Sequence, residues 1–140
     1  MATKKAMEAA LRSAPLFQDL SARNLRQVLA IAETADFMAG ASIVKEGTEG
    51  DSFFVILQGQ ARVVQRGKTV RRLLPGDHFG EISLVDGGKR TASVVSETPM
   101  KMLIVERRAF TKMLQVEPSV AVGLMAGLAR MVRAVERGVR

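Results

Sequence analysis

One stretch of this 140-residue chain, residues 79–94, reads FGEISLVDGGKRTASV and interrupts a series of short apolar runs. It follows the turn signal Pro75-Gly76-Asp77, and its first part predicts a single helical turn, Glu81–Val85, set between two strands. The start of a helix presents free backbone N–H groups, which suit an anion. Gly80 has no side chain, so a bound group can approach the backbone closely. The stretch therefore indicates a loop that binds an anionic ligand.

Two charged residues in this stretch have complementary chemistry. Arg90 offers a planar fork that pairs with two phosphate oxygens, and each such charge-assisted bond contributes about 1.5–3 kcal/mol. Glu81 would repel a phosphate, so it fits the hydroxyl donors of a sugar instead, while Thr91 and Ser93 add hydroxyl groups. A surface loop with a Glu81–Arg90 salt bridge explains the same residues, and from the residues alone this alternative stays open.

The composition is that of a globular domain, with 47% hydrophobic and 25% charged residues. The chain has no cysteine, which excludes disulfides and thiolate metal sites and suits a reducing compartment. No apolar run approaches the roughly 18 residues of a membrane span. Residues 1–15 also lack the apolar core of a signal peptide. We therefore expect a cytoplasmic protein with no membrane segment.

The net charge of +7 is compatible with nucleic acid, an acidic membrane surface or a small anionic ligand. The basic residues are spread along the chain, with no run longer than pairs such as Arg71-Arg72 and Arg107-Arg108. This distribution disfavours a nucleic-acid-binding surface and leaves the other two alternatives open.

The chain divides into three zones. Residues 5–35 have apolar residues at helical spacing, interrupted at Pro15, with Ser21 as the N-cap of a second helix. Residues 106–138 return to helix, with Ser119 as the cap of the last helix. Between them, residues 37–105 hold short β-branched runs separated by glycine turns, which predicts a β-sandwich or barrel. The expected strands are Ala41–Val44, Ser52–Leu57, Ala61–Val64, Ala92–Val95 and Lys101–Val105.

The last helix carries apolar residues at alternating spacings of four and three, namely Leu124, Leu128, Met131 and Val135. Such a stripe packs on the chain's own β-roll, forms a homodimer interface, or closes over a ligand. The spacing alone leaves these three alternatives open.

These motifs together resemble those of the cyclic-nucleotide-binding domain family, which includes the catabolite activator proteins, the kinase regulatory subunits and the cyclic-nucleotide-gated channels. Members carry F-G-E-[LI]-[AS]-L followed by R-[ATS]-[AS]-[TS]-V, and residues 79–84 and 90–94 fit both at the usual spacing. The glycine turns before this stretch match as well. So does the segment Phe110–Leu114, which is similar to the F-x-x-x-L hinge helix of the family. The resemblance covers residues 14–130.

The resemblance implies one cyclic-nucleotide-binding domain over residues 1–140. Its expected fold class is α+β, with an antiparallel β-roll (a double-stranded jelly-roll-like barrel) at residues 37–105. N-terminal helices at 5–35 precede the roll, and C-terminal hinge and lid helices at 106–138 follow it. Residues 79–94 correspond to the phosphate-binding cassette of the family, and we use the name cassette for them below.

The resemblance also implies a role for the cassette residues. Arg90 pairs with the cyclic phosphate, and Glu81 accepts a hydrogen bond from the ribose 2′-hydroxyl. Backbone N–H groups of the cassette help to hold the ribose phosphate. The expected ligand-binding set is Gly80, Glu81, Ile82, Ser83, Arg90, Thr91 and Ala92. Many members have proline where this chain has Lys89, which leaves the loop less rigid but adds favourable potential for the phosphate.

We expect cAMP as the ligand, with cGMP as the alternative. In the family, a threonine directly after the arginine, as at Thr91, is associated with cGMP, because its hydroxyl can accept from the guanine 2-amino group. Such a threonine also occurs in domains that respond to cAMP. One hydroxyl contributes about 1 kcal/mol, which is enough for several-fold discrimination. The final helix should cap the base, with Arg130, Met131 and Arg133 as candidates.

The function that fits is a non-catalytic sensor whose C-terminal helices move on ligand binding, with no cofactor and no metal. A transcription factor of the catabolite-activator type needs a helix-turn-helix after the long helix, and the chain ends at Arg140 without a DNA-reading module. Met1 favours a complete chain, but a regulatory fragment of a larger transcription factor, channel or enzyme fits as well. Metal oxygenases and haem sensors need more ligands than the single His78, which we expect to be structural or solvated. The intact cassette disfavours a degenerate, purely structural domain.

Overall fold

The computed structural model describes residues 3–138, which divide into two compact units. The β-unit comprises residues 32–108. The helical unit comprises the described residues on either side, 3–31 and 109–138.

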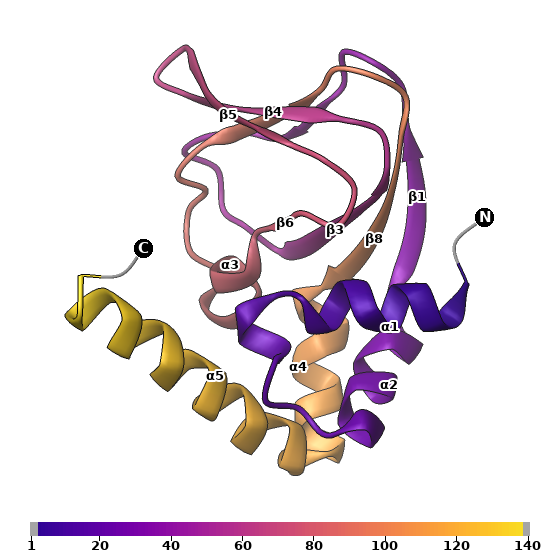
Figure 1. The fold of residues 1–140 in the computed structure, drawn as a ribbon, viewed down its shortest axis with the longest axis vertical. Coiled ribbons are helices and arrows are strands. Elements are labelled where there is room, and N and C mark those ends of the chain that lie inside the picture. Colours follow the sequence, from indigo (N-terminus) through magenta and orange to yellow (C-terminus); the bar gives the residue numbers. More distant parts are fainter. Residues whose placement is uncertain (1–2, 139–140) are drawn as a thin grey trace. The chain divides into compact units, whose positions relative to one another are not determined.

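Eight strands of the β-unit form two antiparallel sheets of four strands each (Figure 1). The first sheet has the order β1 (Glu33–Phe37), β8 (Met100–Glu106), β3 (Ser52–Gln58) and β6 (His78–Phe79). The second has the order β2 (Ser42–Val44), β7 (Ser93–Ser96), β4 (Ala61–Gln65) and β5 (Lys68–Leu73). The antiparallel β-roll is thereby confirmed, as two separate sheets within the described residues and not as one closed barrel.

The core of the β-unit takes side chains from both sheets. Because successive side chains of a strand face opposite sides of the sheet, the residues that meet between the sheets occupy alternate positions: Phe54, Ile56, Met100 and Met102 from the first sheet, and Ala61, Val63, Leu73 and Val94 from the second. Burying a large apolar side chain contributes about 1.5–3 kcal/mol, so this cluster holds the two sheets against each other.

Three of the eight strands are absent from the list of expected strands: β1, β5 and the two-residue β6, and β1 corrects an expected helix. Residues 33–35 were expected to be helical, but helix α2 ends at Ile31 and β1 begins at Glu33. The strand forms because β8 supplies its hydrogen-bonding partners, with Glu33 opposite Ile104 and Phe37 opposite Met100. Strand β5 is exposed except at Leu73 and pairs only with β4. β1 and β5 are both edge strands that bury few apolar side chains, which is why the alternation of apolar and polar residues in their sequences is weak.

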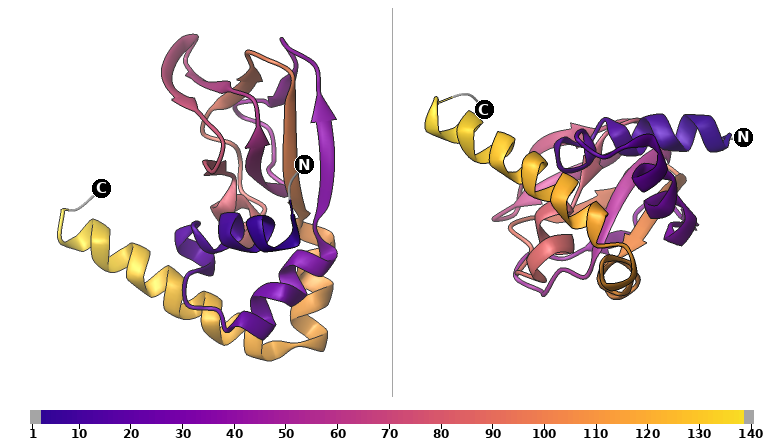
Figure 2. Two further views of the ribbon diagram at one scale, coloured as in Figure 1. Left: turned by 45° about the vertical axis from the view of Figure 1, so that its right-hand side comes forward. Right: turned by 90° about the horizontal axis from the view of Figure 1, so that it is seen from below.

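The helical unit contains α1 (Lys4–Arg12), the 3₁₀ turn η1 (Pro15–Phe17), α2 (Ala22–Ile31), most of α4 (Arg107–Val116) and α5 (Pro118–Glu136). Figure 2 shows the tight turn between α4 and α5. Ser21 caps α2 as predicted, because its Oγ accepts from the backbone N–H of Asn24 at 3.0 Å. The predicted cap at Ser119 is wrong, since α5 begins one residue earlier at Pro118 with Glu117 as N-cap. Proline suits the first helical position, where no N–H is needed.

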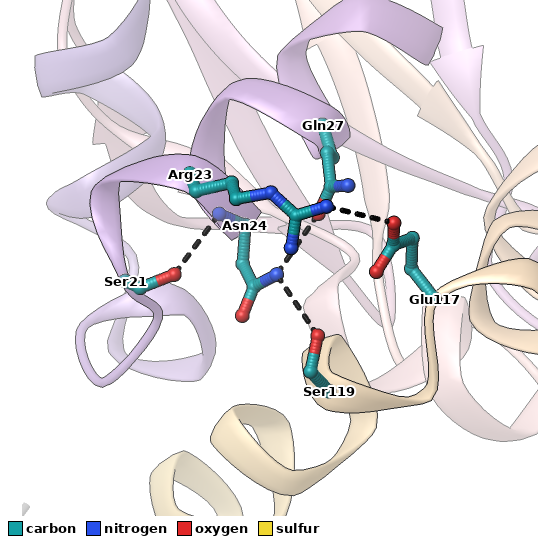
Figure 3. A network of polar contacts seen from close by, with 6 residues as sticks. All are labelled: Ser21, Arg23, Asn24, Gln27, Glu117 and Ser119. Carbon is teal, nitrogen blue, oxygen red and sulfur yellow. Dashed lines mark hydrogen bonds and ion pairs between the residues drawn. The ribbon is translucent and has the colours of Figure 1, made fainter.

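The hydroxyl of Ser119 has another partner, within a polar network that joins α2 to the start of α5 (Figure 3). Nδ2 of the buried Asn24 donates to Oγ of Ser119 at 3.2 Å and to Oε1 of Gln27 at 2.9 Å. Nη2 of Arg23 pairs with Oε1 of Glu117 at 3.1 Å. The network satisfies a buried amide that would otherwise be costly to bury.

Helix α5 packs closely on η1 through two glycines. A Cβ at Gly127 would lie 2.6 Å from the carbonyl oxygen of Leu16, and one at Gly123 would lie 2.6 Å from Cδ2 of Leu20. Of the predicted apolar stripe, Leu124 is buried whereas Val135 is exposed. The exposed apolar row on the helix consists of Val122, Met125, Val132 and Val135, and it shares only Val135 with the predicted stripe.

By length and composition, α5 is the one helix among residues 3–138 that could cross a membrane, with mean hydropathy 1.3 over its most apolar window. A single helix of this kind is weak support for a membrane span. The sequence reading missed it because Arg130 and Arg133 interrupt the apolar residues. Within the helical unit, Nη1 of Arg130 bonds Oε1 of Gln18.

Candidate functional site

The β-unit contains a cavity of about 440 Å³ at the cassette. This volume lies in the range of small-molecule sites, roughly 300–1,000 Å³. Its walls come from the cassette and from both sheets: Val44, Val63, Arg71, His78, Phe79, Gly80, Glu81, Ile82, Ser83, Asp86, Gly88, Lys89, Arg90, Thr91, Ala92 and Val94. The charged lining residues are three cations and two carboxylates, so the cavity is suited to an anion that also carries hydrogen-bond donors.

The predicted helical turn of the cassette is present as α3 (Glu81–Asp86). Glycines flank it on both sides, and both have positive φ: Gly80 at 86° and Gly87 at 67°. Residues with a Cβ rarely adopt these angles. The N–H of Gly87 donates to the carbonyl of Ser83 at 2.8 Å and ends the helix. The sequence therefore fixes both limits of the short helix that carries Glu81.

Arg90 is the most deeply buried charge of the cavity, with 8% of its surface exposed. Its Nη2 donates to the carbonyl of Ser52 at 2.8 Å, and the guanidinium lies 5.9 Å from the centroid of the Phe54 ring. Its Nη1 is buried and has no hydrogen-bond partner among residues 3–138. Burial lowers the pKa of this guanidinium, and the charge of Asp51 partly raises it again. An arginine remains cationic at neutral pH, so the cavity holds a buried cation with an unused donor.

The backbone around Arg90 is fixed by the loop that precedes β3. The N–H of Arg90 donates to the carbonyl of Thr48 at 2.7 Å, and its carbonyl accepts from Gly47 at 2.9 Å. The N–H of Gly50 donates to the carbonyl of Gly88 at 2.9 Å. These bonds hold the second half of the cassette against the loop that precedes β3, so the arginine reaches the cavity from an anchored segment despite the missing proline at Lys89.

Glu81 lies at the first position of α3, with 15% of its side chain exposed. Its Oε1 is 3.6 Å from Nδ1 of His78. The cavity thus carries a carboxylate beside the buried cation of Arg90. A carboxylate accepts hydrogen bonds and an arginine only donates them, so the two side chains suit two different parts of one ligand.

All seven residues of the predicted ligand-binding set line this one cavity. They differ in exposure: Ser83 is buried and its Oγ donates to the carbonyl of Gly88 at 3.3 Å, whereas Ile82 is half exposed. Thr91 is exposed, and its carbonyl accepts from Nε2 of Gln65 at 3.0 Å. Ala92 packs against the core between the sheets. The structure therefore brings the predicted set together.

The predicted base-capping residues Arg130, Met131 and Arg133 lie on α5, in the helical unit. There the guanidinium of Arg130 forms an ion pair with Asp19 and a 2.9 Å hydrogen bond with Gln18. The capping role of these three residues stays a prediction.

Sequence reasoning missed the contribution of the second sheet to the cavity. Val44, Val63 and Val94 supply apolar walls, and Arg71 supplies a further cation from β5. Arg71 was seen only as part of a basic pair, because β5 lacks the apolar alternation that would have identified it as a strand. His78, expected to be structural or solvated, also lines the cavity. Within residues 3–138 the structure brings together no three His, Asp or Glu side chains that could hold a metal ion.

Comparisons with known proteins agree with this geometry. The sequence pattern of the cyclic nucleotide-binding domain matches residues 34–117. The chain is 37% identical over 112 residues to cGMP-dependent protein kinase, isozyme 1, of Drosophila melanogaster. It is 33% identical over 113 residues to the cAMP-dependent protein kinase regulatory subunit of Emericella nidulans. These alignments cover 74% and 79% of this chain but only 15% and 27% of the relatives.

A solved structure has the same fold. The N-terminal domain of a transcriptional regulator from Streptomyces coelicolor A3(2) superposes with a TM-score of 0.83 at 28% identity, covering 92% of this chain and 94% of that one. Because the family pattern spans more than half of the chain and the relatives exceed 30% identity, the resemblance noted from the cassette is confirmed. The chain belongs to the cyclic nucleotide-binding domain family.

Proposed function

We propose that this chain is a non-catalytic sensor domain that binds a cyclic purine mononucleotide in the cavity of the β-unit. The observation that carries the proposal is the buried Nη1 of Arg90, which has no hydrogen-bond partner among residues 3–138. Leaving such a donor unpaired in the interior is costly. A cyclic phosphate supplies the acceptor and the opposite charge, while Glu81 accepts from the ribose 2′-hydroxyl.

A thermal-shift comparison tests this function. We expect cGMP or cAMP to raise the unfolding temperature, since a ligand that binds only the native state stabilises it by about 2.7 kcal/mol at a hundredfold excess over Kd. The open-chain nucleotides 5′-GMP and 5′-AMP should stabilise much less, because their dianionic phosphate does not match the single unused donor. A chain stabilised by neither cyclic nucleotide would be a degenerate member of the family and would contradict the proposal.

For the base, we propose cGMP rather than the cAMP expected from the sequence. The supporting observation is that Arg71 of β5 lines the same cavity as Thr91. Guanine presents acceptors at O6 and N7, which an arginine can pair with two donors, whereas adenine presents a donor at N6. The Thr91 hydroxyl can accept from the guanine 2-amino group. Relatives include kinases of both nucleotides, so their names leave the choice open.

The test of the base is a ratio of affinities. We expect wild-type chain to bind cGMP more tightly than cAMP, and Arg71→Ala to reduce that ratio by roughly tenfold, since a good bidentate pair discriminates by about 1–3 kcal/mol. Arg72→Ala is the matched control, because Arg72 is the neighbouring cation on β5 and its Nε bonds Glu97. A cAMP preference in the wild type, or an unchanged ratio in Arg71→Ala, would return the assignment to cAMP.

We also propose that ligand binding is relayed to the C-terminal helices. The support is the first residue of α4, Arg107, whose Nη2 donates to the carbonyl of Val85 in α3 at 3.4 Å. The N–H of the same residue donates to the carbonyl of Asp51 at 2.7 Å. A shift of the cassette is thereby coupled to the start of α4. Amide hydrogen exchange over residues 107–116 should change on adding nucleotide, and no change there would argue against the relay.

The next proposal concerns the oligomeric state of the domain. The exposed row on α5, with Val122 and Met125 three residues apart and Val132 seven further on, is compatible with a homodimer through this helix. Analytical ultracentrifugation of the chain and of Val132→Glu tests it: a dimer that dissociates in the variant supports the interface.

A cytoplasmic location remains a proposal. A place inside a larger regulatory protein is also a proposal, and its support is that the chain spans only 15–27% of the two curated relatives described above.

A further inference from the structure

His78 lies in the cavity beside the carboxylate of Glu81, although nothing in its sequence context suggested more than a structural role. It belongs to β6 and pairs with Val55 of β3. Its ring lies 5.9 Å from the ring of Phe53, centroid to centroid, and 23% of its side chain is exposed. Strand pairing places the backbone of His78 three residues before Glu81, and its ring lies beside that of Phe53.

The position of Nδ1 in this ring indicates a function for His78 as a hydrogen-bond donor. Nδ1 is buried and has no hydrogen-bond partner among residues 3–138, and Oε1 of Glu81 is 3.6 Å from it. That separation is only slightly beyond a hydrogen bond. An ionised carboxylate is an acceptor with two oxygens, so Nδ1 must carry the proton if the two groups are to bond. A carboxylate has two oxygens that can each accept more than one hydrogen bond, so a bond from His78 leaves Glu81 able to accept from a ligand as well.

We propose that His78 is a positioning residue for Glu81. When nucleotide binds, Nδ1–H donates to Oε1 and fixes the plane of the carboxylate, so that the second oxygen accepts from the ribose 2′-hydroxyl. This inference rests on the proposed function, because His78 can position Glu81 for a ribose only if the cavity binds a nucleotide. A histidine acting through Glu81 affects one hydrogen bond of the ligand, whereas a histidine that only fills space affects the whole cavity.

The 2′-hydroxyl separates these two roles. Calorimetric titration of the full chain should compare wild type, His78→Leu and His78→Asn, each with cGMP, cAMP and their 2′-deoxy analogues. We expect His78→Leu to weaken binding of the preferred nucleotide by about fivefold, the equivalent of one ordinary hydrogen bond. The same variant should bind the 2′-deoxy analogue as well as wild type does, because that ligand makes no bond to Glu81. His78→Asn keeps an N–H donor at the position of Nδ1 and should recover most of the affinity.

The outcomes distinguish this inference from the proposed function. Equal loss for the hydroxylated and deoxy ligands in His78→Leu would assign His78 to packing and overturn the inference alone, as would unchanged affinity for both. Failure of wild-type chain to bind any of the four ligands overturns the proposed function, and the inference with it. If His78→Leu does not fold, as its thermal unfolding will reveal, His78→Gln and His78→Asn carry the same comparison. There, Asn should retain the 2′-hydroxyl advantage, because its amide nitrogen occupies the position of Nδ1, whereas Gln, whose amide lies one bond further out, should lose it; equal advantages in both variants would overturn the inference.

Discussion

The guanidinium of Arg90 occupies the space that a side chain at Gly80 would need. A Cβ at Gly80 would meet Nη1 of Arg90 and would lie 2.6 Å from the carbonyl oxygen of Ser52. The sequence suggested that this glycine admits a ligand to the backbone. The structure adds a second reason, which is that the buried arginine itself requires the missing side chain.

Gly80→Ala should therefore damage both stability and binding. The residue has a φ of 86°, and a strained backbone of this kind costs about 1–3 kcal/mol. The collision with Nη1 adds to that cost and moves the guanidinium away from its position in the cavity. We expect a lower free energy of unfolding in urea and a loss of nucleotide affinity measured by calorimetry.

Gly76→Ala is the control for the backbone strain, because Gly76 has a similar φ of 93° and no atom within 4 Å of its added Cβ. It should lose stability but keep its nucleotide affinity. Equal affinity in the two variants would contradict the idea that Gly80 serves Arg90.

The two glycines of α5 should respond differently to alanine. At Gly127 the added Cβ meets the backbone carbonyls of Leu16 and Pro15, which cannot move aside easily. Overpacking of this kind costs about 1–3 kcal/mol, against a gain of about 1 kcal/mol in helix propensity. At Gly123 the nearest atom is the end of the flexible Leu20 side chain. Urea unfolding should find Gly127→Ala less stable than Gly123→Ala, and the reverse order would show that α5 does not pack on η1 in this way.

The carboxyl of Glu97 connects the turn after β3 with β5 and provides a test by pH. Its pKa is lowered, first by the hydrogen bond from Gln60 (2.8 Å) and then by Arg72 (3.0 Å). A carboxyl whose pKa is lowered by folding stabilises the native state above its unfolded pKa, and this contribution is lost as pH falls through the folded value. Gln60→Ala should raise the pKa of Glu97 in an NMR titration, whereas the exposed control Gln115→Ala should leave it unchanged. If the pKa of Glu97 is unchanged in Gln60→Ala, the hydrogen bond from Gln60 is not what lowers it.

Much of the fold could be predicted because its signals are local. Glycine turns and β-branched runs identified β2, β3, β4, β7 and β8, and the spacing of the cassette identified α3. β1 and β5 could not be found this way, since an edge strand with one neighbour and little buried surface needs no apolar alternation. The start of α5 was placed one residue late because serine was preferred as a cap, although Pro118 is suited to the first helical turn.

The site was predictable where one continuous segment builds it and not where separate strands meet. Glu81 and Arg90 belong to one motif, so their joint presence in the cavity followed from the sequence. Arg71 reaches the same cavity from β5 only because the second sheet folds over the cassette. His78 lies close to Glu81 because of the strand pairing of β6 and the start of α3. The spacing of residues in the sequence does not predict this contact.

The measurement that tests the central claim most directly is a calorimetric titration of wild type, Arg90→Lys and Arg90→Ala with cGMP and cAMP. We expect wild type to bind at one site with a Kd on the order of micromolar or tighter, about 8 kcal/mol or more. Arg90→Lys keeps the charge but loses the planar fork, and should bind roughly tenfold more weakly. Arg90→Ala should lose binding beyond detection while remaining folded. Nucleotide affinity in Arg90→Ala equal to that of wild type would contradict the assignment of this cavity as a cyclic-nucleotide site.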